Sequence, residues 1–267
     1  MSRLLQISDP HFGTERPEVV AALLRLACAL APDAIVLSGD ITQRATPAQF
    51  AAAAAFLAEL PPVPRLVVPG NHDIPWGFGV RRLAAPYQAF RRGLGIGLEG
   101  ELQLTDCLLV GINSSRWWRR IEGVYGPAQV ARAAQRLRRA GGERLRAIVG
   151  HHPLAVPTPA EAHHVAWGNR HALREFAAAG VDLLLSGHIH LPAVFPCRIE
   201  PSVRGVWCVQ AGTAVSRRTR AGVPNSVALI RYEPTASARR CVVERWDFDA
   251  APAEFRRVAE SSCGIER

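Results

Sequence analysis

The feature that most constrains the fold is a regular alternation of short apolar, β-branched segments with longer segments of helical spacing. The first apolar segments span residues 4–7, 34–37 and 65–68, and each has the length of a strand. The stretch from Val19 to Leu30 between the first two carries apolar residues at helical intervals. This βαβαβ order predicts strands covered by helices, with functional residues in the loops at the carboxyl ends of the strands.

Further along the chain, the pattern continues and then changes. Strand-length apolar segments recur at residues 108–112, 146–149 and 183–185. After residue 190, segments 206–210, 227–232 and 242–247 follow one another without a long helix between them, which predicts a second sheet that completes the same core. We expect one catalytic domain over residues 1–249, followed by a C-terminal tail or helix over residues 250–267.

Composition narrows the class of protein. No apolar run reaches the roughly 20 residues that a membrane span needs, and the N-terminus lacks the long apolar region of a secretory signal, so we expect a cytoplasmic protein. The six cysteines form no C-x-x-C pair and are expected to be buried, reduced thiols. A net charge of +9 is compatible with nucleic acid binding. Because every basic residue is Arg, a general composition bias explains the charge better, and nucleic acid is not the favoured partner.

Side chains that bind metal ions follow five of the predicted strands. They stand in the motifs Asp9-Pro10-His11, Gly39-Asp40, Gly70-Asn71-His72-Asp73, Gly150-His151-His152 and Gly187-His188-Ile189-His190. Carboxylate, amide and imidazole groups together suit a pair of divalent ions. On a strand-like backbone, the residues of Asp-x-His or His-x-His point to the same side and can bind one ion. Any one of these histidines alone would be read as structural, but their joint occurrence predicts a two-metal centre.

In this order, the five motifs resemble the pattern D-x-H, G-D, G-N-H-[DE], G-H and G-H-x-H of the calcineurin-like metallophosphoesterase superfamily. The resemblance covers residues 9–190. It implies an α/β (α+β) fold, a four-layer αββα sandwich of two mixed β-sheets flanked by helices. The dimetal site would lie at the carboxyl ends of the strands.

The resemblance also implies roles for individual residues. It assigns Asp9, His11 and His190 to one metal ion, Asn71, His151 and His188 to the other, and Asp40 to a bridge between them. His72 would contact the substrate phosphate and stabilise charge or protonate the leaving oxygen, while Asp73 would orient His72. Two divalent ions per chain are implied, and Mn, Fe, Zn and Co all accept such ligands.

Two further segments look like the class III cyclic-nucleotide phosphodiesterase-like branch of this superfamily. They are residues 111–116 and residues 212–220, the latter followed by Asn225-Ser226. The substrate contacts that we expect are His152, Arg116 and Arg217, while Arg218 and Arg220 of the same segment are further candidates. Each of these arginines is also compatible with a solvated surface position. His163 and His164 occupy an expected loop between two motif-bearing strands, either exposed or lining a substrate mouth.

The resemblance therefore implies a phosphodiesterase that hydrolyses a small diester, a 3′,5′-cyclic nucleotide or a glycerophosphodiester, through a hydroxide that bridges the metals. A nuclease or a phosphomonoesterase with the same metal site remains an alternative, because loops around such a site select the substrate. A non-catalytic interaction module is the alternative from another class. Trp117 and Trp118 are candidates for stacking on a base, for packing or for the contact of a homo-oligomer.

Overall fold

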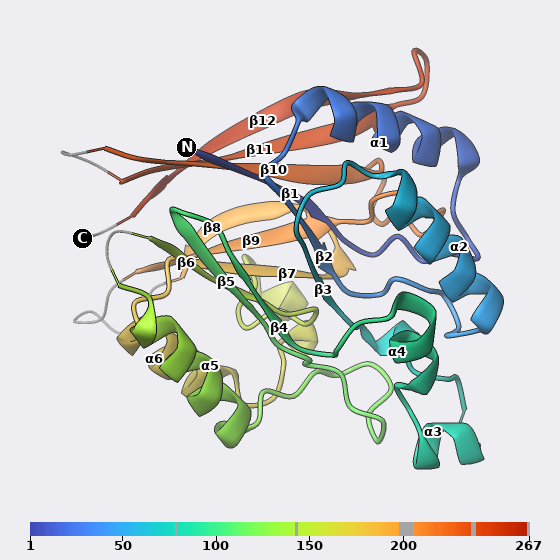
Figure 1. Cartoon of the computed structure of the whole chain (residues 1–267), viewed down its shortest axis with the longest axis horizontal. Coiled ribbons are helices and arrows are strands. Elements are labelled where there is room, and N and C mark those ends of the chain that lie inside the picture. The colour runs from blue at the N-terminus through green and yellow to red at the C-terminus, as the bar shows by residue number, and fades with distance from the viewer. Residues whose placement is uncertain (78, 142–143, 198–204, 236–238, 266–267) are drawn as a thin grey trace.

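The computed structural model describes residues 1–77, 79–141, 144–197, 205–235 and 239–265. The chain folds into two mixed β-sheets of six strands each that pack face to face, with helices on the outer faces (Figure 1). This arrangement confirms the predicted four-layer αββα sandwich. No helix in these ranges combines the length and hydrophobicity that crossing a bilayer requires.

The first sheet has the strand order β12-β11-β10-β1-β2-β3. Strands β1, β2 and β3 run parallel, whereas β10 pairs antiparallel with β1 and begins the antiparallel half of the sheet. The strands are β1 (Ser2–Ile7), β2 (Ala34–Ser38), β3 (Arg65–Val68), β10 (Ser226–Pro234), β11 (Arg239–Asp249) and β12 (Glu254–Gly264).

The second sheet has the strand order β4-β5-β6-β7-β9-β8. Its four central strands run parallel, and β4 and β8 pair antiparallel at the two edges. The strands are β4 (Gly100–Gln103), β5 (Cys107–Gly111), β6 (Leu145–Val149), β7 (Leu183–His190), β8 (Ala193–Cys197) and β9 (Val206–Gly212).

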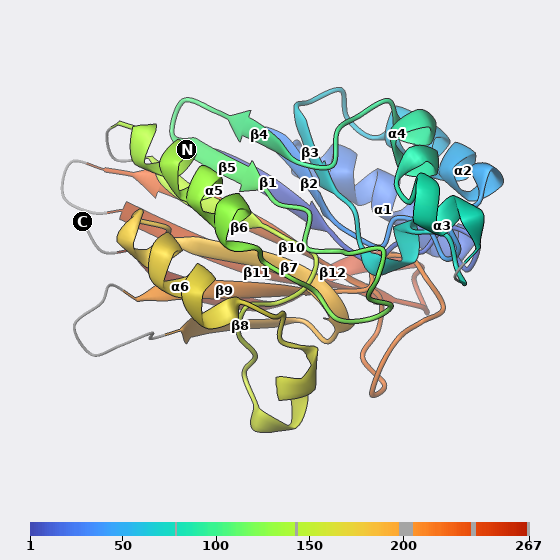
Figure 2. The ribbon, with the colours of Figure 1, turned by 90° about the horizontal axis from the view of Figure 1, so that it is seen from below.

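Helices α1 (Pro17–Leu30) and α2 (Pro47–Glu59) cover the first sheet, and α5 (Pro127–Arg139) and α6 (Asn169–Ala178) lie side by side over the second (Figure 2). Proline occupies the first turn of α1, α2 and α5, where its missing N–H has no intrahelical partner anyway. The remaining elements are α3 (Val80–Ala84), α4 (Gln88–Leu94) and the 3-10 helices η1 (Asn71–Asp73) and η2 (Pro159–His164).

The hydrophobic core lies in three layers, one between the sheets and one under each pair of helices. Leu4, Val36, Val149 and Leu185 are among the side chains between the sheets. Strands covered on both faces are buried at almost every position, as in β2, and this explains their continuous apolar sequence.

One prediction about the C-terminal segment needs correction, and two strands were not predicted. The C-terminal stretch is neither a tail nor a helix: residues 254–264 form the edge strand β12, in which Phe255 and Cys263 are buried. The short edge strands β4 and β8 were not expected from the sequence. Pro196 is tolerated in β8 because an edge strand does not need every backbone N–H for pairing.

Candidate metal centre

The five motifs meet at one place, where the carboxyl ends of strands from both sheets converge. Asp9 and His11 follow β1, Asp40 follows β2, and His151 follows β6. Here the sheets are joined by the Gln6 side chain of β1, whose amide donates to the Ser186 carbonyl of β7 at 3.1 Å. The topology thus brings together residues that lie up to about 180 positions apart in the chain.

One group of ligand atoms comes from Asp9, His11 and His190, all of which are buried. His190 Nε2 lies 3.1 Å from both His11 Nε2 and Asp9 Oδ1. His11 Nε2 lies 3.8 Å from the same carboxylate oxygen. Two imidazole nitrogens and a carboxylate oxygen that converge on one point provide the ligand set of a divalent ion.

The Asp40 carboxylate stands between this group and a second one. Its Oδ2 atom is 3.6 Å from His11 Nε2 and 3.3 Å from His151 Nε2, while Oδ1 accepts a hydrogen bond from the backbone N–H of His72 at 2.8 Å. One oxygen therefore faces both groups, as a bridging ligand requires.

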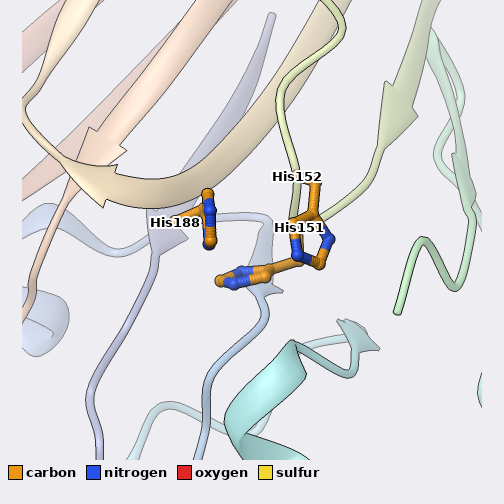
Figure 3. Close-up of side chains that lie close together, drawn as sticks. All are labelled: His151, His152 and His188. Atoms are coloured by element: carbon orange, nitrogen blue, oxygen red, sulfur yellow. The ribbon is translucent and has the colours of Figure 1, made fainter. Parts of the chain in front are cut away.

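The second group contains Asn71, His151 and His188. His151 Nε2 lies 3.3 Å from Asn71 Oδ1, and Figure 3 shows the His188 ring of β7 facing the His151 and His152 side chains of the loop after β6. His188 Nε2 is buried and has no hydrogen-bond partner within the described ranges. A buried imidazole nitrogen without a partner is costly unless an ion binds it, so this group also fits a metal ion.

Backbone carbonyls set the orientation of two of the imidazole rings. The Ser38 carbonyl lies 3.0 Å from Nδ1 of His151, and the Arg218 carbonyl lies 2.6 Å from Nδ1 of His190. A carbonyl only accepts hydrogen bonds, so each Nδ1 is the donor and each Nε2 is left to face the centre. Metal-binding histidines in proteins nearly always donate their second ring N–H in this way.

The ionisation of the site favours cations. Burial lowers the pKa of His11 to about 3 and holds that of His188 well below its ordinary value, so both rings are neutral. Burial alone would raise the pKa of Asp9, but the neighbouring His190 and His151 together more than offset this and lower it to about 2. Burial likewise opposes the charged form of His151, yet Asp40 beside it raises the pKa to about 9. The carboxylates thus stay ionised and hold protons on their neighbours that a cation would replace.

The backbone at the ligand positions is unusual. Asp9, His11, Asp40, His188 and His190 all have positive φ, between 46° and 70°. For the Asp-x-His and His-x-His motifs we predicted that strand alternation points both side chains to the same side. The side chains instead converge through left-handed backbone turns. In β7, the pairing register also shifts between Ser186 and His190. Strained backbone of this kind is found mainly at functional sites.

Close packing explains the glycines that precede the ligands. A Cβ atom on Gly70 would overlap the Asp40 carboxylate, and one on Gly187 would overlap Asp9. Gly39 combines a φ of +96° with a position directly against the His151 ring. Each of these glycines allows one motif to pack against the ligand of another motif.

The residues after Asn71 separate into two roles. The side chain of His72 lies beside the metal groups, with its ring edge-on to that of His11 at 4.8 Å between centroids. We predicted that Asp73 orients His72, but it does not. Its carboxylate accepts hydrogen bonds from the backbone N–H groups of Gly70, Ile41 and Thr42, so it ties the loops after β2 and β3 together.

The Gln43 carbonyl is the group that orients His72, because His72 Nδ1 lies 2.9 Å from it. His72 Nε2 is then the ring atom that faces Arg218, whose guanidinium lies 3.0 Å away. Arg218 also donates to the Gln43 side chain at 3.0 Å. No local sequence pattern predicted the role of Gln43.

Two of the predicted substrate contacts, His152 and Arg116, make hydrogen bonds within the protein instead. His152 is buried, and its ring nitrogens lie 2.8 Å from Ser114 Oγ and the Ile121 carbonyl, so it has no donor or acceptor left for a substrate. Arg116 donates to the carbonyls of Asn113 and Ser115 and supports its own loop. Both predictions are therefore corrected to structural roles.

In the arginine segment, the structure selects a different residue from the predicted one. The side chains of Arg217 and Arg218 are both exposed, but only that of Arg218 makes a side-chain contact with His72. Arg220 donates to His164 Nε2 at 3.0 Å, and the His164 ring stands 5.1 Å from that of His188. We expected His163 and His164 either to be exposed or to line a substrate mouth. His163 is exposed, whereas His164 borders the metal centre.

The fold and this cluster together define a metal-dependent phosphoesterase of the two-metal class. The sequence model for the calcineurin-like phosphoesterases matches residues 2–192. The chain belongs to this family, which confirms the resemblance found in the motifs. Comparison with curated protein sequences gave no match.

Solved structures with the same fold are distant in sequence. A dimetal phosphatase from Danio rerio aligns with a TM-score of 0.69 and 14% identity over 99% of both chains. Purple acid phosphatase PPD1 from yellow lupin seeds aligns with a TM-score of 0.72 and 11% identity over 98% of this chain and 53% of its own. Vacuolar Protein Sorting 29 from Cryptosporidium parvum reaches a TM-score of 0.51 with 13% identity, over 98% of this chain and 97% of its own.

Proposed function

We propose that this protein is a two-metal phosphodiesterase that hydrolyses small phosphodiesters of the cyclic-nucleotide or glycerophosphodiester type. The observation that carries the proposal is the position of His72 against the ligand His11 and of the Arg218 guanidinium against His72, since neither residue belongs to a proposed metal site. One cationic and one imidazole side chain beside a two-metal site suit an anionic phosphoryl group whose charge must be neutralised during hydrolysis.

Each part of the site has a proposed task. Asp9, His11 and His190 would hold one ion, Asn71, His151 and His188 the other, and Asp40 both. When bound, the ions supply Lewis-acid charge and acidify a water molecule toward neutral pH. Arg218 would turn from His72 to a phosphoryl oxygen, and His72 would exchange a proton with the leaving oxygen through Nε2, since Nδ1 is held by Gln43.

A phosphomonoesterase is the second candidate. The solved structures from Danio rerio and yellow lupin, which share the fold, are described as phosphatases. The ligand groups themselves bind a phosphoryl centre and do not distinguish a monoester from a diester.

The two candidates are separated by comparing two substrates with the Mn²⁺-loaded protein. We expect faster hydrolysis of bis-p-nitrophenyl phosphate than of p-nitrophenyl phosphate, and no activity in the Asp40→Asn variant, which controls for contaminating enzymes. A monoester preference would establish the phosphatase instead. The absence of metal-dependent activity on both esters would favour the specialised nuclease or the non-catalytic module.

The arginine segment offers a matched pair of variants. Arg218→Ala should lower kcat/KM for the diester by about tenfold to a hundredfold, because it removes a charge-assisted contact to the phosphoryl group. Arg217→Ala, with an exposed side chain at the neighbouring position, should leave kcat/KM unchanged. Equal effects of the two substitutions in steady-state assays would remove Arg218 from the site.

We also propose the cytoplasm as the compartment. All six cysteines are free, which suits a reducing environment. Cys28 is exposed and Cys197 is only partly buried, so the prediction that these thiols are buried holds for the other cysteines.

A further inference from the structure

Two cysteines face each other across the last two strands of the first sheet. Cys241 of β11 and Cys263 of β12 are directly opposite in the antiparallel register, and both are free thiols. We infer that this pair is a site of reversible disulfide formation, at which a low-molecular-weight disulfide such as glutathione disulfide cross-links the edge strand β12 to β11. The inference is independent of the proposed phosphodiesterase activity.

The backbone register gives the Cys241–Cys263 pair the spacing that a disulfide needs. Directly opposite residues of antiparallel strands have Cα atoms about 4.5 to 5.5 Å apart, and a disulfide spans about 4.4 to 6.8 Å between Cα atoms. Both side chains are buried in the core layer between the sheets, so they point to the same face. A hydrogen bond between the two thiols, together with burial, raises the pKa of Cys241 well above its ordinary value. The bond can therefore form without a large movement of the backbone.

The other cysteines that have a thiol nearby are less well placed. Cys197 of β8 interacts with Cys208 of β9, but the register pairs Phe195 with Cys208, so the two cysteines are diagonal neighbours. Diagonal neighbours are about 7 to 8 Å apart, beyond the usual reach of a disulfide. Cys107 lies in the same core layer as Cys241 but on the opposite sheet, and packed sheets are about 10 Å apart. Geometry thus favours the Cys241–Cys263 pair.

Local opening of β12 gives a small disulfide access to Cys263. The strand has a single hydrogen-bonded neighbour, and Phe255 and Cys263 are its only buried side chains. Phe255 packs against Phe248 near one end, with 5.6 Å between the ring centroids, whereas Cys263 lies one residue before the other end. A strand end with so few buried contacts opens at a fraction of the cost of global unfolding, and the opening exposes the Cys263 thiol.

The exchange consumes one glutathione disulfide. The Cys263 thiolate attacks one of its sulfurs, which forms a mixed disulfide and releases one glutathione thiolate. When β12 pairs again, Cys241 gives up its proton and its thiolate attacks the Cys263 sulfur, which releases the second glutathione. The protein is thereby oxidised by two electrons, and the glutathione disulfide is reduced to two thiols. An excess of reduced glutathione reverses both steps, so the pair stays open in a reducing compartment.

The cross-link should stabilise the fold without changing the metal centre. Cys241 pairs with Tyr232 of β10, which pairs with Ser2 at the amino end of β1, whereas the ligand motifs follow the carboxyl ends of the strands. Positions 241 and 263 are 22 apart in the sequence, and closing this loop restricts the unfolded chain. We expect the Tm of the oxidised protein to rise by about 5 to 10 °C, with kcat/KM unchanged.

Mass mapping of the full chain tests the site. The protein is incubated with glutathione disulfide without denaturant, its remaining thiols are alkylated, and it is digested with trypsin without reduction. Trypsin cuts after arginine and places the two cysteines on separate peptides, residues 241–245 and 258–267. We expect these peptides to be joined, with a mass two hydrogens below their sum. Dithiothreitol should separate them and reverse the rise in Tm.

Three variants and the other thiols complete the test. Cys263→Ala should lose both the joined peptide and the rise in Tm, and Cys241→Ala should do the same should the first variant fold poorly. Cys28→Ala, which changes an exposed cysteine of α1, should retain both. Glutathione on single cysteines without a joined peptide, a link between Cys197 and Cys208 in its place, or a joined peptide without a rise in Tm would each overturn the inference.

Discussion

Asp40→Asn is expected to remove metal binding and activity together. The substitution keeps the size of the side chain but replaces the charged oxygen between His11 Nε2 and His151 Nε2 with a neutral amide. Loss of a group that only hydrogen-bonds to a ligand costs about tenfold to a hundredfold in metal affinity. Loss of the bridging carboxylate should lower the affinity of both metal sites by more than this. We therefore expect turnover to fall by at least about a thousandfold.

Metal analysis and thermal unfolding check this expectation independently of any substrate. Mn²⁺ should raise the Tm of the wild-type protein, because an ion that binds only the folded chain stabilises it, and should leave the Tm of Asp40→Asn nearly unchanged. The exposed Asp33→Asn is the control for the loss of one carboxylate and should behave as wild type. Two ions per chain in purified Asp40→Asn would exclude the bridging role, and one firmly bound ion would confine Asp40 to the other position.

His72→Ala is expected to lose activity but keep its metal ions. Its backbone N–H, which donates to Asp40 Oδ1 at 2.8 Å, survives the substitution, so the ligand geometry is retained. What is lost is the imidazole whose Nε2 faces Arg218. Removing a general acid typically costs about a hundredfold to ten-thousandfold in rate, and we expect kcat to fall within this range while the metal content stays at the wild-type level.

The leaving group tells which task His72 performs. A p-nitrophenolate leaves without needing a proton, whereas an alkoxide needs one. If His72 protonates the leaving oxygen, His72→Ala should lose more activity on an alkyl diester than on a p-nitrophenyl diester. Equal losses would assign it to charge stabilisation alone. The control is His171→Ala, which changes an exposed residue of α6. If His72→Ala lost as much metal as Asp40→Asn, the division of roles between His72 and Asp40 would be contradicted.

Much of the centre was predictable because its residues follow strands. The apolar runs of β1, β2, β3, β6 and β7 are readable in the sequence, since strands covered on both faces must be apolar throughout. The metal-capable motifs lie where these runs end, or, in β7, close to the end. Parallel strands of one sheet bring their carboxyl ends to the same edge, so local pattern groups the motifs after β1, β2 and β3 and, separately, those of β6 and β7. The packing of the two sheets against each other then brings the two groups together.

Roles that depend on contacts across the chain were not predictable. Arg217 and Arg218 are adjacent and chemically identical, and only the direction of the loop after β9 decides which one reaches His72. Asp73 follows His72 in sequence, but its carboxylate accepts hydrogen bonds from the backbone N–H groups of the loop after β2. His152 follows a proposed ligand, and its partners Ser114 and Ile121 belong to another loop.

The sequence by itself determined the family and the set of side chains gathered at the strand ends, because strand and motif are local signals, and the four-layer fold followed from the resemblance that the motifs carry. Only the tertiary structure decided that the C-terminal segment pairs as the edge strand β12, since pairing with β11 depends on a neighbouring strand and not on local propensity. It also decided that the ligands converge through left-handed turns at positions such as Asp9 and His188. Conformations of this kind cost free energy and persist only where the surrounding contacts impose them.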